Sequence, residues 1–335
     1  MPSGSSSVSA LSVRRAALEA EELYTACEYD FNTAAETVRF YRQKITAFLR
    51  WAQANGLASV NGDAVRAFFR HLKDTKHSEG GRHAYLRALR TWFNFLRRRK
   101  VIGESPLADA DIRIAPRTLE RPILPKAEQL HGLLAAMRTD VFRKGRQEAD
   151  FVRLRDYALT LFVLESGARR REALVDVGDV DLQFGTAQTV QKVRRHATTR
   201  PLFFPSIRHL VRFYMEERQQ VLQSLGKEDV TALWVSDDGE PLTPGAMSQI
   251  FKRIKRRYRW DGRFHPHRLR ADAATMAAFS GDRTRLELMM GWAPGTPVAR
   301  RYLNLAGEMQ AAAESMPTMS PLRMLARLRR PQRSD

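Results

Sequence analysis

Residues 266–275 read PHRLRADAAT and contain His267 and Arg270 in the spacing H-x-x-R. The spacing alone is weak evidence, because a chain of 335 residues with 8 His and this many Arg should contain about one such pair by chance. The sequence contains three, and the other two are His209/Arg212 and His265/Arg268. The neighbouring sequence must therefore decide which pair carries a function.

Two further segments flank this stretch in order along the chain. Residues 166–174 read SGARRREAL, with three consecutive arginines ahead of Glu172. Downstream, Trp292 follows a glycine, and Tyr302 lies ten residues beyond that tryptophan (302 − 292). Between the flanking segments, Lys192 is the only lysine from residue 145 to residue 226.

The chain is strongly basic. It carries 56 Lys and Arg against 37 Asp and Glu, a formal net charge of +19, and 46 of the basic residues are arginine. Such a charge predicts a polyanionic partner, which could be DNA, RNA or an anionic membrane surface. Apolar residues make up 43%, which excludes a wholly disordered chain.

Several kinds of site are missing from the sequence. The single cysteine, Cys27, excludes a disulfide framework, a cysteine zinc site and a CxxC redox motif. There is no HExxH motif, paired acidic metal cluster or Gly-rich phosphate loop, so we expect neither a metal nor a cofactor. No apolar run of about 18 residues predicts a membrane span, and the Ser-rich start is not a convincing signal peptide. We therefore expect a cytoplasmic, nucleoid-associated protein.

Phosphodiester chemistry without a metal requires three kinds of side chain. A nucleophile attacks, fixed cationic donors hold the non-bridging oxygens, and an acid protonates the leaving oxygen. Arginine suits the second task, since its fork of donors matches phosphate and keeps its charge at any working pH.

The three segments together resemble boxes of the tyrosine recombinase, or phage integrase, family. PHRLRADAAT resembles that family's P-H-x-L-R-H-x-x-A-T box, which selects His267 and Arg270 among the three pairs. SGARRREAL resembles the T-G-L-R-x-x-E-L box and assigns Arg169 and Glu172. Trp292 stands where the family has His or, in some members, Trp, and residues 299–302 resemble the segment that bears a nucleophilic tyrosine.

The resemblance covers about residues 33–305 and has departures. Residues 37–51 and 84–96 resemble the family's core-DNA-binding domain, and Lys192 fits the lysine of its β-hairpin. Ala271 replaces a common His, and the hairpin lacks the usual G-K-G-x-K pattern. Some 30 residues precede the bundle, so we expect a simple Xer- or Cre-like type without an arm-binding domain.

The resemblance implies a site-specific DNA recombinase that cuts and rejoins DNA through a 3′-phosphotyrosyl link, in integration, excision or resolution. In that interpretation, Tyr302 attacks the phosphate, and Arg169 and Arg270 hold the non-bridging oxygens of the phosphate. His267 assists the proton transfer from the tyrosine, Lys192 protonates the leaving oxygen, Trp292 buttresses the site, and Glu172 orients the arginines. It also implies a homotetramer on synapsed double-stranded DNA, with two domains clamped around each duplex.

Apolar periodicity predicts a mainly α fold with a small antiparallel β-sheet in two domains, one helical and one mixed α/β. The resemblance implies the two-domain tyrosine recombinase architecture, in which the mixed α/β domain is the catalytic one. We expect a flexible tail at 1–30, a helical core-DNA-binding (SAM-like) domain at 31–105, a linker at 106–126, a catalytic domain at 127–305 and a tail at 306–335 that docks on a neighbour. The basic residues expected to contact DNA, mostly its backbone, are Arg87, Arg90, Arg97, Arg98, Lys252 and Arg256.

Two other functions remain open from the sequence. A type IB topoisomerase-like enzyme would use the same chemistry to relax DNA without synapsis. A sequence-specific DNA-binding protein with an impaired site would bind in a salt-sensitive manner and form no covalent species.

Overall fold

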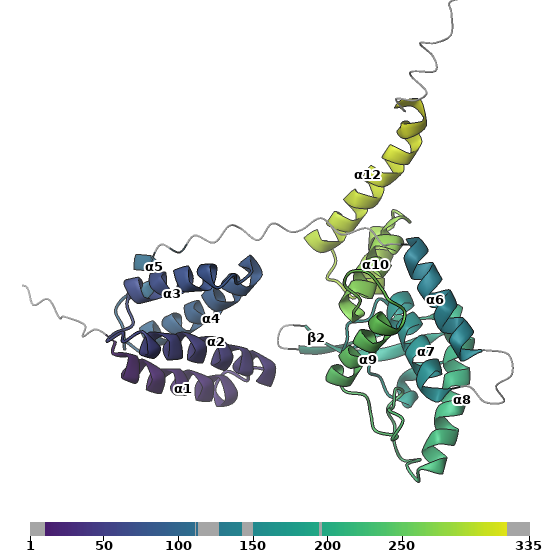
Figure 1. The fold of residues 1–335 in the computed structure, drawn as a ribbon, viewed down its shortest axis with the longest axis horizontal. Coiled ribbons are helices and arrows are strands. Elements are labelled where there is room, and N and C mark those ends of the chain that lie inside the picture. The colour runs from purple at the N-terminus through teal and green to yellow at the C-terminus, as the bar shows by residue number, and fades with distance from the viewer. Residues whose placement is uncertain (1–10, 111, 113–126, 143–149, 194–195, 320–335) are drawn as a thin grey trace, which may run out of the picture. The chain divides into compact units, whose positions relative to one another are not determined.

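The computed structural model describes residues 11–110, 112, 127–142, 150–193 and 196–319, in two compact units whose boundary falls at residues 119/120 (Figure 1). The fold is mostly helical with one small antiparallel sheet, so the predicted fold class is confirmed. No helix in the described ranges is both long enough and apolar enough to cross a bilayer.

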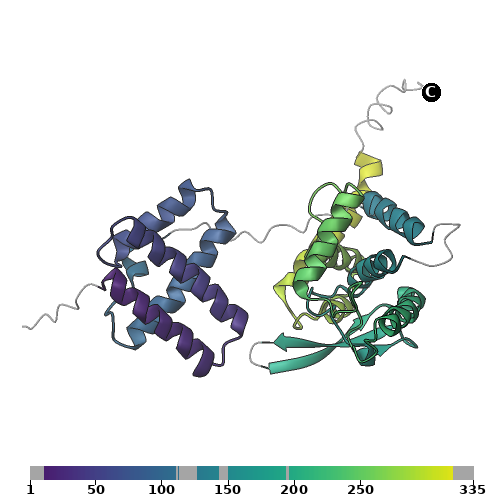
Figure 2. The same cartoon turned by 60° about the horizontal axis from the view of Figure 1, so that its bottom comes forward.

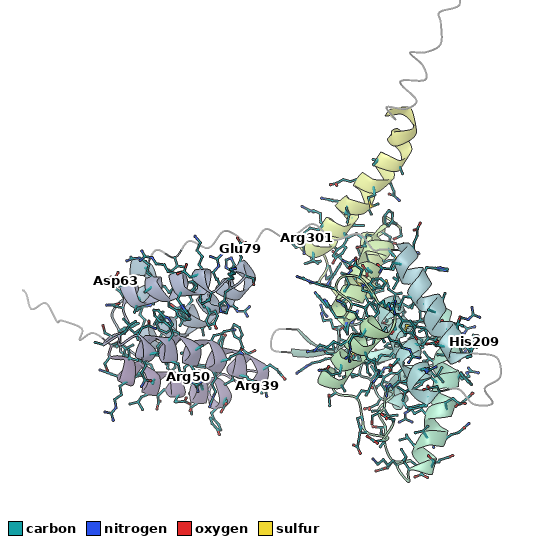
Figure 3. All side chains as sticks on the ribbon, in the orientation of Figure 1. Arg39, Arg50, Asp63, Glu79, His209 and Arg301 are labelled. Carbon is teal, nitrogen blue, oxygen red and sulfur yellow. The ribbon has the colours of Figure 1, made fainter. Side chains whose placement is uncertain are left out.

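The first unit is an all-helical bundle. Its helices are α1 (Val13–Tyr29), α2 (Ala35–Ala54), α3 (Gly62–Asp74), α4 (Glu79–Arg98) and α5 (Pro106–Ala110). Each of the long helices buries one apolar face, and the aromatic rings of Phe48, Phe68 and Trp92 meet at the centre. Charged side chains lie outside, as Arg39 and Arg50 of α2 show (Figure 3).

Two predictions for this unit are wrong. Residues 13–29 are not a flexible tail but form α1, whose Ala16, Ala20 and Leu23 are buried against α2 and α4. The first residues of the predicted linker, 106–110, form α5, which packs on α3 and α4. Pro106 starts that helix because the first helical position needs no backbone N–H. Residues 111 and 113–126 lie outside the described part of the chain.

The second unit surrounds α7 (Phe151–Ser166). Its other elements are α6 (Ala127–Val141), η1 (Val177–Asp179), β1 (Val180–Asp181), β2 (Thr186–Val193), β3 (His196–Phe203), η2 (Pro205–Ile207), α8 (Arg208–Ser224), α9 (Pro244–Arg257), α10 (Pro266–Ala278), α11 (Arg283–Met290) and α12 (Pro297–Met319). The sheet has the order β1-β2-β3, and β2 pairs with β3 from Thr186↔Phe203 to Val193↔His196 (Figure 2).

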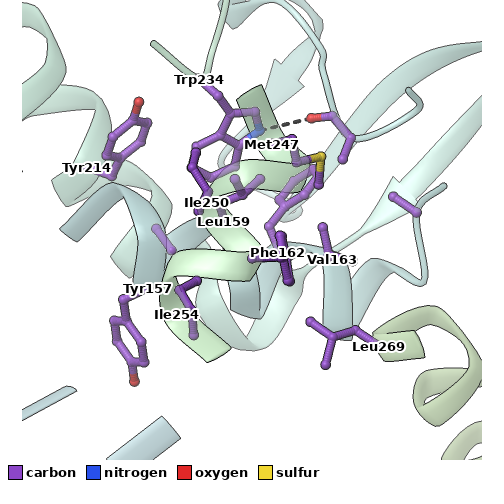
Figure 4. Packing of buried hydrophobic residues seen from close by; sticks show 14 of the residues in the cluster. Tyr157, Leu159, Phe162, Val163, Tyr214, Trp234, Met247, Ile250, Ile254 and Leu269 are labelled. Atoms are coloured by element: carbon purple, nitrogen blue, oxygen red, sulfur yellow. Dashed lines mark hydrogen bonds between the residues drawn. The ribbon is translucent and has the colours of Figure 1, made fainter. Parts of the chain in front are cut away.

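The core beside α7 holds the segment after residue 167 in place. Phe162 of α7 packs edge-on against Trp234, and the Trp234 indole donates a hydrogen bond of 2.9 Å to the carbonyl of Ala173 (Figure 4). Both aromatic side chains are almost completely buried. The backbone that follows α7 is therefore anchored to the core within a few residues of Arg169.

The last helix extends beyond the predicted domain end. α12 continues through residue 305 to Met319, so residues 306–319 are helical rather than a separate tail. Leu322, Leu325 and Leu328, which suggested an apolar stripe, lie outside the described residues.

Candidate active site

Glu172 is the centre of the site. Its carboxylate is buried, with a side chain 6% exposed, and three arginines face it: the nearby Arg169, and Arg200 and Arg270 from distant parts of the chain. Arg169 donates to it from both its backbone N–H (2.9 Å) and its side chain, Arg200 donates at 3.1 Å, and Arg270 lies at 3.6 Å. The hydrogen bonds and positive charges lower the pKa of Glu172 below its usual value although burial opposes them.

Arg270 is fixed by backbone carbonyls as well as by this carboxylate. Its residue is 4% exposed on α10, and its guanidinium donates to the carbonyls of Gly167 and Met290. Gly167 ends α7 in the left-handed conformation (φ 58°), which turns the chain toward Arg169. Burial, together with the like charge of Arg169, lowers the pKa of Arg270.

Trp292 and Tyr302 lie beside Arg270. Their rings are stacked with centroids 5.4 Å apart and planes 26° apart, and the Arg270 guanidinium lies 5.8 Å from the centroid of the indole. Gly291 closes α11 with φ 57°, and the turn that follows carries Trp292 to the start of α12. Tyr302 sits in the second turn of α12, directly after Arg301, which Figure 3 labels at the base of that helix.

The Tyr302 side chain is partly buried. Its pKa is raised by burial, and Asp272 raises it further, while Arg301, Arg270 and Arg268 act in the opposite direction. The phenol is therefore neutral near pH 7 and needs a base when it attacks.

His267 lies in the first turn of α10, three residues before Arg270. Partial desolvation lowers its pKa, and so do the positive charges of Arg270 and Arg169, so the ring is neutral near pH 7. The ring of His265 is parallel to it at 6.5 Å and caps α10 by accepting the N–H of Arg268 at 3.1 Å.

No contact is described between the remaining predicted residues and this cluster. Lys192 has its backbone in β2, opposite Ala197 of β3, and its side chain lies outside the described part. The six residues expected to contact DNA are all exposed, on α4 (Arg87, Arg90, Arg97, Arg98) and on α9 (Lys252, Arg256). Of the three consecutive arginines, the side chain of Arg169 reaches Glu172, and Arg170 instead donates to Ser248 at 2.8 Å.

Two groups in the cluster are not predicted by the sequence motifs. Arg200 of β3 is buried against Glu172, and only the arrangement of the strands brings it there. Asp272 is buried on α10 and pairs with Arg268 at 2.8 Å. The i,i+4 spacing of that pair was a signal in the sequence. No group of acidic, His and Cys residues in the described ranges has the arrangement of a metal site.

The helical bundle, the mixed α/β unit and the tyrosine stacked beside clustered arginines fit the class of enzyme that cleaves and rejoins DNA strands, and the comparisons with known proteins establish that class. Residues 126–309 of the chain match the phage integrase family, and residues 28–100 match the phage integrase N-terminal SAM-like domain. The chain belongs to the phage integrase family, and the predicted class, a tyrosine-type site-specific recombinase, is confirmed.

The chain is also similar to individual proteins in sequence and in fold. The chain is 28% identical to tyrosine recombinase XerC 2 of Ralstonia nicotianae (strain ATCC BAA-1114 / GMI1000) over 278 residues, which is 78% of this chain and 74% of the relative. Its fold resembles the XerH recombinase bound to difH DNA in a post-cleavage complex (TM-score 0.64, 16% identity, 92% and 91% coverage). It also resembles the Tn1549 transposon integrase in complex with circular intermediate DNA (TM-score 0.63, 15% identity, 87% and 95% coverage).

Proposed function

We propose that Tyr302 cuts one DNA strand by attacking a phosphate and remains joined to its 3′ end. The observation that carries the proposal is the stacked Trp292–Tyr302 pair beside a buried, carboxylate-held arginine. The tyrosine oxygen forms the new bond to phosphorus as the bond to the 5′ oxygen breaks. Because the covalent link retains the phosphodiester, a 5′ hydroxyl rejoins the strand by the reverse step.

The arginines supply the positive charge for this step. Arg270 uses two of its donors on the carbonyls of Gly167 and Met290, and its remaining N–H groups serve the non-bridging oxygens. Arg169, with a side chain 41% exposed, is open to the second oxygen. Fixed donors of this kind stabilise charge that develops in the transition state without reorganising when the reaction occurs.

Two proton transfers accompany the exchange of bonds. His267, neutral because its pKa is lowered, takes the proton of the Tyr302 hydroxyl. Lys192, on the strand that pairs with β3, protonates the 5′ oxygen as it leaves. Trp292 supports the tyrosine ring by stacking, and Glu172 orients the arginines.

Double-stranded DNA is the partner, and four copies of the chain act on two synapsed sites. Two known structures of similar fold, those of XerH and the Tn1549 integrase, are complexes with DNA. The exposed arginines of α4 and the basic residues of α9 contact the phosphate backbone and give salt-dependent affinity. The chain beyond residue 305 docks on a neighbouring copy.

A covalent trap in cells tests the reaction. Cells expressing wild type or Tyr302→Phe are denatured rapidly, the protein is recovered, and the attached DNA is sequenced. We expect DNA ends at recurrent sites on wild type and none on the variant, which still protects those sites in a footprint.

Two other results would favour the DNA-binding or the topoisomerase-like function instead. If wild type also fails to react with a nicked substrate built on a footprinted site, the DNA-binding alternative replaces the enzyme. Relaxation of supercoiled plasmid without recombination would indicate the topoisomerase-like function.

A further inference from the structure

Arg200 is a buried cation that the reaction above does not use. It lies on β3, and its side chain is only 7% exposed. Its register partner on β2 is Thr189, three residues before Lys192. A buried guanidinium is costly unless its donors are satisfied, so its partners indicate why it is there.

The two ends of the Arg200 guanidinium contact different parts of the site. Nη2 donates to Oε2 of Glu172 at 3.1 Å, and Nη1 donates to the carbonyl of Met289 at 2.8 Å. The Arg200 side chain therefore joins β3 to the segment after α7 and to the end of α11.

The contact with the end of α11 is close. The backbone of Gly291 lies so near that a Cβ atom there would be 2.5 Å from Cδ of Arg200. Arg200 and Arg270 also donate to successive carbonyls, those of Met289 and Met290, in the last turn of α11. The last carbonyls of a helix lack internal partners and attract cations, so these two arginines hold the helix end that precedes Trp292.

Another buried arginine of the same unit shows what a purely structural role looks like. Arg218 of α8 is 4% exposed and donates to the carbonyls of Ala232 and Val230, at 2.9 and 2.6 Å. Neither partner belongs to the site, and no described contact joins Arg218 to Glu172. Arg200 differs because both of its partners position groups that act on the phosphate.

We propose that Arg200 is a positioning residue that locks Glu172, and through it Arg169 and Arg270, to the Gly291–Trp292 turn, and ties the stem of the β2–β3 hairpin to the same point. The inference rests on the proposed function, since it assigns Arg200 a task in cleavage by Tyr302. Loss of Arg200 therefore slows the covalent step more than it weakens DNA binding.

The test compares wild type with Arg200→Met, Arg200→Lys and Arg218→Met on a nicked DNA built around a site recovered by the trap. The rate constant of adduct formation is measured at saturating protein, and affinity is measured by gel shift. Arg200→Met should slow the reaction about 10- to 100-fold at unchanged affinity, because small misplacements have effects of that size. Lysine keeps the charge but reaches only one partner, so its rate should fall between those of wild type and Arg200→Met.

A second readout needs no DNA target. The indole N–H resonance of Trp292, assigned with Trp292→Phe, should shift in Arg200→Met and stay in place in Arg218→Met. Wild-type rates in Arg200→Met, or equal slowing in Arg218→Met, would overturn the inference. If wild type itself forms no adduct, the proposed function fails, and an unmoved indole resonance in Arg200→Met then overturns the positioning role separately.

Discussion

The two units of the molecule differ in whether they bury charged side chains. Among the described residues, all buried charged side chains belong to the second unit: Arg155, Asp156, Glu172, Arg200, Arg218, Arg270, Asp272 and Glu287. The bundle has many arginines, but those expected to meet DNA lie on its exposed surface, some of them over aromatic rings, as Arg87 does over Phe40 at 4.6 Å.

Exposed and buried arginines are expected to serve different tasks, the first DNA binding and the second the cleavage reaction. An exposed arginine is free to follow a phosphate backbone, and it contributes binding that salt weakens. A buried arginine has lost its water and is held by a carboxylate or by carbonyls, so its donors have fixed positions before DNA arrives. Removing an arginine that contacts Glu172 should therefore change the rate. Removing an exposed arginine of the bundle that contacts phosphate should change the affinity.

The largest effect is expected for Arg270→Met. The variant should slow adduct formation on a nicked substrate by about 100- to 1,000-fold, the usual loss when one fixed donor to a developing charge is removed. Gel shifts at the same site should show little loss of affinity. A control, Arg218→Met, removes a buried arginine outside the site and should leave the rate of the folded protein unchanged. A large loss of affinity in Arg270→Met would break the division between the two units.

Glu172→Gln should lower the free energy of unfolding at pH 7 by about 3 kcal/mol, because it leaves three arginines around an uncharged group. The pKa of Glu172 is lower in the folded protein than its ordinary 4.5, so its stabilisation is complete above that pH and is lost as the pH falls through the lowered value. Denaturant titrations of wild type and variant should therefore converge in acid.

The surface pair between Lys227 and Glu240 provides the comparison for that measurement. Glu240 has a side chain 67% exposed, so Glu240→Gln should change stability by less than about 1 kcal/mol at any pH. An equal effect of the two substitutions would show that burial does not strengthen the Glu172 cluster.

The smallest effect is expected in the bundle. Arg97→Ala on α4 should reduce the slope of log affinity against log salt by about 1, the value for one phosphate contact, and leave the rate at saturating DNA unchanged. Arg15→Ala, which removes an exposed arginine of α1, serves as the control and should leave the slope as it is. A slower covalent step in Arg97→Ala would mean that the bundle takes part in catalysis.

The sequence predicted the helices well where one large apolar face repeats. The pattern of α2 (Val38, Ile45, Phe48) is unmistakable, and so is that of α4. The helix α1 was missed because its buried face is made largely of small residues such as Ala16 and Ala20, although their spacing with Leu23 is helical. Pro106 was taken for a helix breaker, whereas the structure places it at the start of α5.

The site was predictable only as far as local motifs extend. Arg169, His267, Arg270 and Tyr302 lie in recognisable segments, and the structure brings Arg169, Arg270 and Tyr302 close to Trp292 or Glu172. Arg200 stands in no such segment, since its role arises only when β3 meets the end of α11. Contacts of that kind are set by tertiary packing and not by spacing along the chain.

The attachment point of the DNA decides whether Tyr302 is the nucleophile. Protein recovered from the trap is digested with protease and nuclease, and the nucleotide-bearing peptide is sequenced by mass spectrometry. We expect a nucleotide joined through its 3′ phosphate to Tyr302, with a free 5′ hydroxyl on the opposite DNA end. A nucleotide on any other residue, or a link through a 5′ phosphate, would contradict it.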